Sequence, residues 1–213
     1  MMKPVWVFDL DNTLHNATPH IFPHINRSMI AYLQQHLGLD ERAADEMRMH
    51  YWKRYGATLS GMMKHHDTDP EHFLWQTHQF PELPKMVLRE PRLRHALKKL
   101  PGRKFIFSNA PQHYARAVLE LLRVDDLFED VFAIEHARYR PKPQMEGFVR
   151  LLNKHRLNPA RCVMVEDSAE NLQTAKRLGM KTVWVSNVPR RPAYVDVKIR
   201  GVLELPRALS RLL

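Results

Sequence analysis

From Val5 to Thr13 the chain reads VWVFDLDNT, four apolar residues followed at once by a segment with two aspartates. A continuous apolar run of this length, rich in β-branched and aromatic residues, is typical of a strand buried on both faces, as in a parallel sheet. The aspartates would then lie at the carboxyl end of that strand, where open parallel sheets bind their ligands. This segment therefore predicts both a fold class and the position of a site.

Four further runs of the same kind occur later in the chain. Together with the first, the predicted strands are Val5–Phe8, Lys104–Phe107, Val131–Ile134, Cys162–Val165 and Thr182–Val185. Between them, apolar residues recur at helical spacing in three groups, which are Ala115/Val118/Leu119/Leu122, Met145/Phe148/Val149/Leu152 and Leu172/Ala175/Leu178. Strands that alternate with helices in this way predict an α/β fold with a doubly wound parallel sheet.

A long stretch without a strand pattern separates the first two predicted strands. Its apolar residues recur at helical spacing, and we expect helix boundaries at Gly38, Asp40, Gly56 and Asp69-Pro70. We therefore predict a small helical cap domain over residues 16–87, with residues 1–15 and 88–213 forming the α/β core. An insertion that leaves the carboxyl edge of a parallel sheet would cover the ligand site.

Polar side chains follow the predicted strands at the points where they end. They are Asp9 and Asp11 after the first strand, Ser108 and Asn109 after the second, Lys142 a little beyond the third, and Glu166 and Asp167 after the fourth. Because the carboxyl ends of parallel strands meet at one edge of the sheet, we expect these groups to share a pocket. Carboxylates without cysteine are typical of a site for a hard cation, and a site of few carboxylates suits Mg²⁺.

This set of groups is suited to phosphoryl transfer from a small phosphate monoester. Asp9 would be the nucleophile that forms an aspartyl-phosphate, and Asp11 would act as general acid and then as general base. Lys142 would neutralise charge on the nucleophile and the phosphoryl oxygens. Ser108 and Asn109 would contact phosphate oxygens. Asp167, helped by Glu166, would hold the metal.

In this order, the residues resemble the four motifs of the haloacid dehalogenase superfamily. Asp9 to Thr13 matches its DxDx[TV] motif, Ser108 its hydroxyl residue at a strand end, Lys142-Pro143 its lysine, and Glu166-Asp167 its acidic pair. The resemblance covers essentially the whole chain. It implies a Mg²⁺-dependent phosphatase that forms an aspartyl-phosphate on Asp9. The metal-ligand set would then consist of Asp9, Asp167 and Glu166, with the main-chain carbonyl of Asp11 as a further ligand.

A helical cap between the first two motifs resembles the C1 class of that superfamily. The segment Tyr51–Gly61 resembles the second cap helix of pyrimidine 5′-nucleotidases, and Glu166–Asn171 resembles their acidic motif with Glu in the first place. That departure also occurs in phosphomutase-like relatives, so it leaves the subfamily open. The resemblance implies a nucleoside monophosphate such as UMP or CMP as substrate. Tyr51 and Tyr55 would then stack on the base, although aromatic residues at helical spacing are also typical of a cap core.

Other functions stay open at the level of the sequence. A sugar phosphatase or a phosphomutase would use the same four motifs. Haloacid dehalogenases lack the second aspartate of the first motif, so Asp11 disfavours that reaction, and a phosphonatase would need a cap lysine, for which Lys53 and Lys64 are the candidates. A non-catalytic protein that binds phosphorylated metabolites would be expected to have a damaged nucleophile or metal site, whereas the motifs here are intact.

Composition limits the expected partners and environment. The net charge is +10, but the basic residues are scattered and form no usual nucleic-acid-binding motif, so we expect small anionic substrates and no nucleic acid polymer. The single cysteine, Cys162, excludes an intramolecular disulfide, and no apolar segment approaches the length of a membrane span. We expect a cytoplasmic monomer or dimer without a membrane partner.

Overall fold

The computed structural model describes residues 3–212. Within them the strands are β1 (Val5–Phe8), β2 (Arg103–Phe107), β3 (Asp130–Phe132), β4 (Cys162–Glu166), β5 (Lys181–Val185) and β6 (Val197–Ile199). They form a parallel sheet in the order β3-β2-β1-β4-β5-β6. The predicted α/β fold with a doubly wound parallel sheet is confirmed.

Helices connect these strands. The α-helices are α1 (Ile21–Leu37), α2 (Glu41–Tyr55), α3 (Thr58–His66), α4 (Pro70–Thr77), α5 (Leu83–Met86), α6 (Leu93–Lys98), α7 (Gln112–Leu122), α8 (Met145–Lys154), α9 (Ala169–Arg177) and α10 (Leu205–Ala208). Short 3-10 helices are η1 (Asp125–Leu127), η2 (Pro159–Arg161), η3 (Val202–Glu204) and η4 (Leu209–Arg211). Among the described residues, no helix has both the length and the apolarity needed to cross a bilayer.

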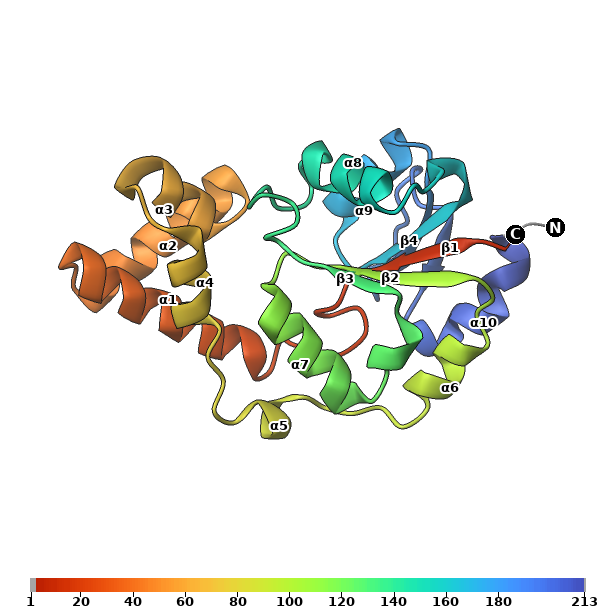
Figure 1. Cartoon of the computed structure of the whole chain (residues 1–213), viewed down its shortest axis with the longest axis horizontal. Helices are drawn as coiled ribbons and strands as arrows, with labels where there is room; N and C mark the ends of the chain where they lie inside the picture. The colour runs from red at the N-terminus through yellow and green to blue at the C-terminus, as the bar shows by residue number, and fades with distance from the viewer. Residues whose placement is uncertain (1–2, 213) are drawn as a thin grey trace.

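Helices cover both faces of the sheet. In Figure 1, α8 and α9 lie on one side of the strands, and α6, α7 and α10 lie on the other. Alternate residues of β1 belong to the two resulting cores, Trp6 and Phe8 to one and Val5 and Val7 to the other. All four side chains are buried, which explains why this strand is a continuous apolar run and does not alternate with polar residues.

The structure corrects several details of the predicted elements. The sixth strand, β6, was not predicted, because its short segment places Lys198 between Val197 and Ile199 and lacks a continuous apolar run. Strand β3 ends at Phe132, two residues before its predicted end. In α8 the exposed side chains of Met145 and Val149 lie outside the core, so only half of the apolar group predicted there is buried.

Helices α1 to α4 form a cluster beyond the carboxyl ends of the strands, at the left of Figure 1. The side chain of Asp40 accepts a hydrogen bond from the amide of Ala43 at the start of α2, and Gly38 and Gly56 end α1 and α2 in the left-handed conformation, as predicted. The chain then forms α3 as a separate helix. A third core lies between these helices and includes Leu33, Tyr51, Met62 and Phe73. The assignment of residues 16–87 as a cap domain stays a prediction.

Candidate active site

The loop after β1 carries the first two aspartates. The amide of Asp9 continues the sheet by donating a hydrogen bond to the carbonyl of Val165 on β4, at 3.0 Å. The chain then turns through Asn12, whose φ of 61° is in the left-handed region. The Asn12 side-chain oxygen accepts hydrogen bonds from the amides of Ala17 and Thr18, at 3.0 and 3.2 Å. These bonds hold the turn that presents Asp11.

Lys142 lies at the centre of the site and is almost completely buried. Its ammonium group donates to Asp9 Oδ1 at 2.7 Å, to Glu166 Oε2 at 2.8 Å and to the carbonyl of Phe107 at 2.7 Å. A lysine ammonium has three donors, so these bonds use all of them. The predicted association of Lys142 with the candidate nucleophile is therefore present in the geometry.

Glu166 is held on every side. Besides Lys142, its Oε2 accepts a hydrogen bond from the side-chain amide of Asn171 at 3.0 Å, and its Oε1 accepts from the amides of Asp167 and Ser168 at 3.0 and 3.1 Å. Both carboxylate oxygens are engaged and the residue is 1% exposed. This geometry favours Glu166 as the anchor of Lys142 over the predicted role as a metal ligand.

Burial and mutual repulsion of the carboxylates set the electrostatics of the site. Burial, and then the charge of Glu166, raise the pKa of Asp9 to about 7, even though Lys142 opposes both effects. Burial also raises the pKa of Glu166 and of Asp167. Although burial disfavours its charge, the adjacent Asp9 and Glu166 carboxylates raise the pKa of Lys142 above its ordinary value. The lysine therefore stays charged, and the carboxylates would gain from further positive charge.

The residues present fit a divalent cation. One oxygen each of Asp9, Glu166 and Asp167 lie within 4.8 Å of one another, and Asp11 adds a fourth carboxylate beside a single ammonium. Oxygen ligands with this excess of negative charge suit Mg²⁺. Because both oxygens of Glu166 are hydrogen-bonded, Asp9 and Asp167 are the members of this group with the freer oxygens, and the predicted role of Glu166 as a metal ligand stays a prediction.

Asp11 is positioned by two buried side chains. The hydroxyl of Tyr114, on α7, donates to Asp11 Oδ1 at 2.6 Å, and His15 Nε2 lies 2.8 Å from the same oxygen. Burial and the neighbouring Asp11 carboxylate raise the pKa of Tyr114, so its hydroxyl stays protonated and remains a donor. The other carboxylate oxygen, Asp11 Oδ2, has no hydrogen-bond partner within the described residues. This support was not predicted from the sequence.

Ser108 and Asn109 follow β2 and lie in the same site. Ser108 is 2% exposed, and its Oγ accepts a hydrogen bond from the amide of Ala110 at 3.0 Å, which leaves the hydroxyl proton for a phosphate oxygen. Asn109 instead bonds the main chain of Lys142, accepting from its amide at 2.8 Å and donating to its carbonyl at 3.1 Å. Through these bonds Asn109 fixes the loop that carries Lys142. Direct contact between Asn109 and phosphate stays a prediction.

The hydrogen bonds and ring contacts of Tyr51 and Tyr55 within the described residues are all with residues of the helical cluster. Tyr51 is 7% exposed in the core of the helical cluster, where its hydroxyl lies 2.8 Å from His66 Nε2. The Tyr55 hydroxyl lies 2.7 Å from His65 Nε2. These contacts favour the cap-core interpretation of the aromatic pair, most clearly for Tyr51.

Comparisons with known proteins agree with this geometry. The family model described as a haloacid dehalogenase-like hydrolase matches residues 5–179. Phosphate metabolism protein 8 of Saccharomyces cerevisiae is 23% identical over 193 residues, which is 84% of this chain and 60% of the yeast protein. The chain therefore spans about three fifths of the length of that curated relative.

Solved structures share the fold over nearly the whole chain. A HAD phosphatase from Thermococcus onnurineus has a TM-score of 0.69 at 24% identity, with 98% of both chains covered. L-2-haloacid dehalogenase from Xanthobacter autotrophicus, with chloropropionic acid covalently bound, has a TM-score of 0.61 at 16% identity, with 98% and 99% covered. The magnesium-bound HAD hydrolase YfnB of Bacillus subtilis has a TM-score of 0.62 at 14% identity, with 98% and 99% covered.

Proposed function

The chain belongs to the haloacid dehalogenase-like hydrolase family, and from that premise we propose that it is a Mg²⁺-dependent phosphatase that hydrolyses small phosphate monoesters. The observation that carries the proposal is Asp11, held by Tyr114 and His15 two residues beyond the candidate nucleophile. A departing alkoxide needs a proton, whereas a departing halide needs none. A positioned acid beside Asp9 therefore favours ester cleavage over dehalogenation.

The first step transfers the phosphoryl group to Asp9. A carboxylate oxygen of Asp9 attacks phosphorus, the bond from phosphorus to the ester oxygen breaks, and Asp11 gives its proton to the departing alkoxide. The ammonium group of Lys142 favours the ionised form of Asp9. Ser108 donates a hydrogen bond to a phosphoryl oxygen. Mg²⁺ bound by Asp9 and Asp167, and by the main-chain carbonyl of Asp11 as the family resemblance implies, would neutralise charge on the phosphoryl oxygens.

The second step releases phosphate. Asp11, now ionised, takes a proton from a water molecule, whose oxygen attacks phosphorus and displaces the Asp9 carboxylate. Inorganic phosphate leaves and both aspartates return to their starting states. The names of two relatives, phosphate metabolism protein 8 and the Thermococcus phosphatase, support a phosphate ester as the substrate class.

Within this class we place pyrimidine nucleoside 5′-monophosphates first. The support is the resemblance of Tyr51–Gly61 and Glu166–Asn171 to pyrimidine 5′-nucleotidases. Because Tyr51 is packed inside the helical cluster, selection of the base would fall to other cap residues or to a half-buried Tyr55. Helices α1 to α4 would then form a C1-type cap over the site, residues 16–87 in all.

The test is phosphate release from UMP, CMP, AMP, glucose 6-phosphate and phosphoglycolate, with Mg²⁺ and with EDTA. We expect release with Mg²⁺, none with EDTA and none from D9N, with UMP or CMP the best substrates. Chloride release from 2-chloropropionate is measured in parallel. Release of chloride without phosphate would overturn the phosphatase proposal, isomerised sugar phosphate without free phosphate would indicate a mutase, and binding without any turnover would indicate a metabolite-binding protein.

A further inference from the structure

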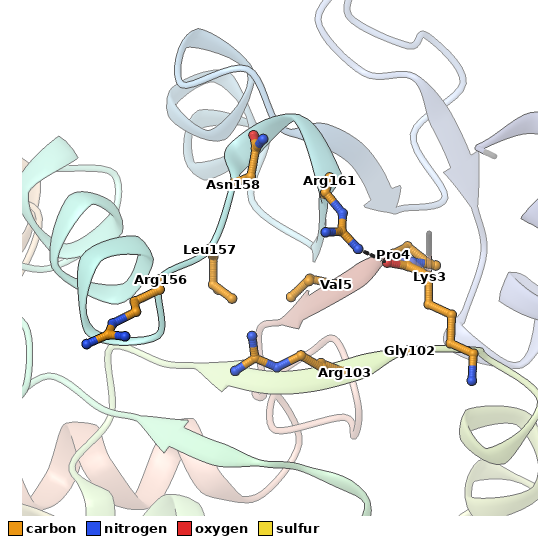
Figure 2. A pocket seen from close by; sticks show the side chains of 9 residues that line it. All are labelled: Lys3, Pro4, Val5, Gly102, Arg103, Arg156, Leu157, Asn158 and Arg161. Atoms are coloured by element: carbon orange, nitrogen blue, oxygen red, sulfur yellow. Dashed lines mark hydrogen bonds between the residues drawn. The ribbon is translucent and has the colours of Figure 1, made fainter. Parts of the chain in front are cut away.

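A cavity of about 410 Å³ lies at the amino ends of β1 and β2 (Figure 2). Its walls come from the first residues of β1 and β2 and from the segment between Arg156 and Arg161 that leads into β4. Strand β1 begins at Val5 and Asp9 follows its last residue. At about 3.3 Å per residue, roughly 13 Å of strand separates the cavity from the nucleophile. The cavity is therefore a different site from the one built by the four motifs.

The cavity is strongly basic. Lys3, Arg103, Arg156 and Arg161 line it, and its lining contains no acidic residue. Arg103 is fixed by hydrogen bonds of 2.7 and 2.6 Å from Nε and Nη2 to Glu129, which lies outside the lining. The described residues contribute no carboxylate within ion-pair distance of the other three cations. Their positive charge is thus available to an anion from solution.

The floor of the cavity is apolar. Val5 and Leu157 are 6% and 8% exposed, and Pro4 is also buried. In Figure 2 these side chains lie among the basic groups, and the Arg161 guanidinium bonds the carbonyl of Lys3, at 2.9 Å from Nη2. A hydrated inorganic anion gains nothing from an apolar surface. A ligand with an apolar ring as well as negative charge would use both features of the cavity.

We propose that this cavity binds a nucleotide of the nucleoside di- or triphosphate class. Guanidinium groups pair with phosphate oxygens in bidentate fashion, and the three cations without an ion-pair partner within the described residues, Lys3, Arg156 and Arg161, can serve more than one phosphate group. The cavity is in the size range of small-molecule sites. A nucleic acid polymer would need basic residues spread along a track, whereas these basic residues line a single cavity. The cavity would then be a second anion-binding site of the molecule, separate from the substrate site.

Calorimetric titration of the full chain with ATP, in EDTA, tests the proposal. R156Q/R161Q removes two charges from the cavity, and R27Q/R89Q removes two from exposed arginines elsewhere as the matched control. We expect at least tenfold weaker ATP binding in the first variant and less than a twofold change in the second. Tripolyphosphate should bind the wild type more weakly than ATP does, and adenosine should not bind measurably. Phosphate release by R156Q/R161Q should equal that of the wild type.

Several results would overturn the proposal. Absence of ATP binding would contradict the site directly. Equal losses of ATP affinity in both double variants would mean that ATP is attracted only by the positive charge of the whole chain. Equal affinity for tripolyphosphate and ATP would contradict the role of the apolar floor. Tighter binding of a 20-nucleotide single strand than of ATP, weakened by R156Q/R161Q, would indicate a polymer as the ligand. If the double variant misfolds, R156Q alone gives the same comparison, because Arg156 is exposed at its tip and its side chain has no hydrogen bond within the described chain.

Discussion

The hydroxyl of Tyr114 lies 2.6 Å from Oδ1 of Asp11, and this hydrogen bond joins α7 to the loop after β1 across 103 positions of the chain. Since His15 Nε2 contacts the same oxygen, two buried side chains fix Oδ1 of the Asp11 carboxylate, and Oδ2 has no hydrogen-bond partner within the described residues. A general acid has to reach the ester oxygen with its proton in a defined direction. Tyr114 is thus a positioning residue for the proposed reaction.

Y114F removes the hydroxyl and keeps the ring in the core. A hydrogen bond to a charged group contributes about 1.5–3 kcal/mol, and because His15 still holds Asp11 we expect the lower end of that range, which is a loss of about tenfold in kcat. KM should change little, since Tyr114 holds the acid and does not contact the proposed phosphate position. Y194F, at a half-buried tyrosine packed against the opposite core, is the control. Equal kcat values for Y114F and Y194F would contradict the positioning role.

Glu166 and Asp167 are neighbours in the sequence, but the structure gives them different surroundings. Glu166 uses both oxygens on Lys142, Asn171 and two amides, whereas the Asp167 carboxylate is half-buried and faces the candidate cation position. We therefore expect D167N to raise the Mg²⁺ concentration needed for half-maximal phosphate release by at least tenfold. Its melting temperature in EDTA should stay at or above that of the wild type, because a repelling carboxylate is removed.

E166Q should lower the stability of the protein more than it changes the Mg²⁺ dependence, which is the reverse of D167N. It leaves Lys142 with one charged partner and disturbs a buried network, and we expect a loss of about 2–3 kcal/mol in the free energy of unfolding in EDTA. The Mg²⁺ dependence of any remaining activity should shift less than in D167N. A shift in half-maximal Mg²⁺ as large as that of D167N, with unchanged stability, would show that Glu166 is a metal ligand after all.

Much of the candidate site follows from the sequence because parallel strands bring their carboxyl ends together. Asp9 and Glu166 needed only strand assignments to be placed near one another. Lys142 lies well beyond the end of β3, and its match to the lysine motif was needed to place it beside both carboxylates, which it does contact. Tyr114 could not be found in this way. It lies in a helix whose apolar neighbours Ala115 and Val118 give it the pattern of a core residue, and only the packing of α7 against the sheet directs its hydroxyl to Asp11.

In the helical cluster, too, the sequence predicts local features but not the packing between helices. Glycine and aspartate signals placed the ends of α1 and α2 correctly, because caps depend on local chemistry. The position of Tyr51 depends on how closely α3 approaches α2, which no local signal predicts. A Cβ at Gly61 would lie 2.2 Å from Cγ of Tyr51, so the glycine is what allows the tyrosine ring to pack between these helices.

G61A provides a test with two opposite expectations. Intrinsic propensity predicts that alanine in α3 stabilises the helix by about 1 kcal/mol. The contact with Tyr51 predicts a net loss of about 1–3 kcal/mol, as for overpacked cores, because the tyrosine has to move. We expect the loss, measured by urea unfolding, while S60A at the neighbouring position should change stability by less than about 0.5 kcal/mol. A stabilised G61A would contradict the close approach of α2 and α3.

His78 is buried at the end of α4 beside Tyr114. Burial, followed by the nearby His113, lowers the pKa of His78 to about 4 from an ordinary 6.5. Because the unfolded chain binds this proton more readily than the folded chain, the group contributes its full stability above pH 6.5 and loses it as the pH falls towards 4. Between pH 7 and pH 5 the loss amounts to about 2 kcal/mol.

H78N should remove that part of the pH dependence. The Thr77 hydroxyl donates its proton to the carbonyl of Phe73 at 2.8 Å and lies 3.0 Å from His78 Nδ1. An asparagine amide can still donate a hydrogen bond to that hydroxyl oxygen, but it does not titrate. We expect the free energy of unfolding of the wild type, measured with urea in EDTA, to fall by about 2 kcal/mol more between pH 7 and pH 5 than that of H78N. H95N, at an exposed histidine, should fall as the wild type does. Equal falls in H78N and the wild type would mean that His78 gains its proton as easily in the folded chain as in the unfolded one, which its burial against Tyr114 and Phe80 opposes.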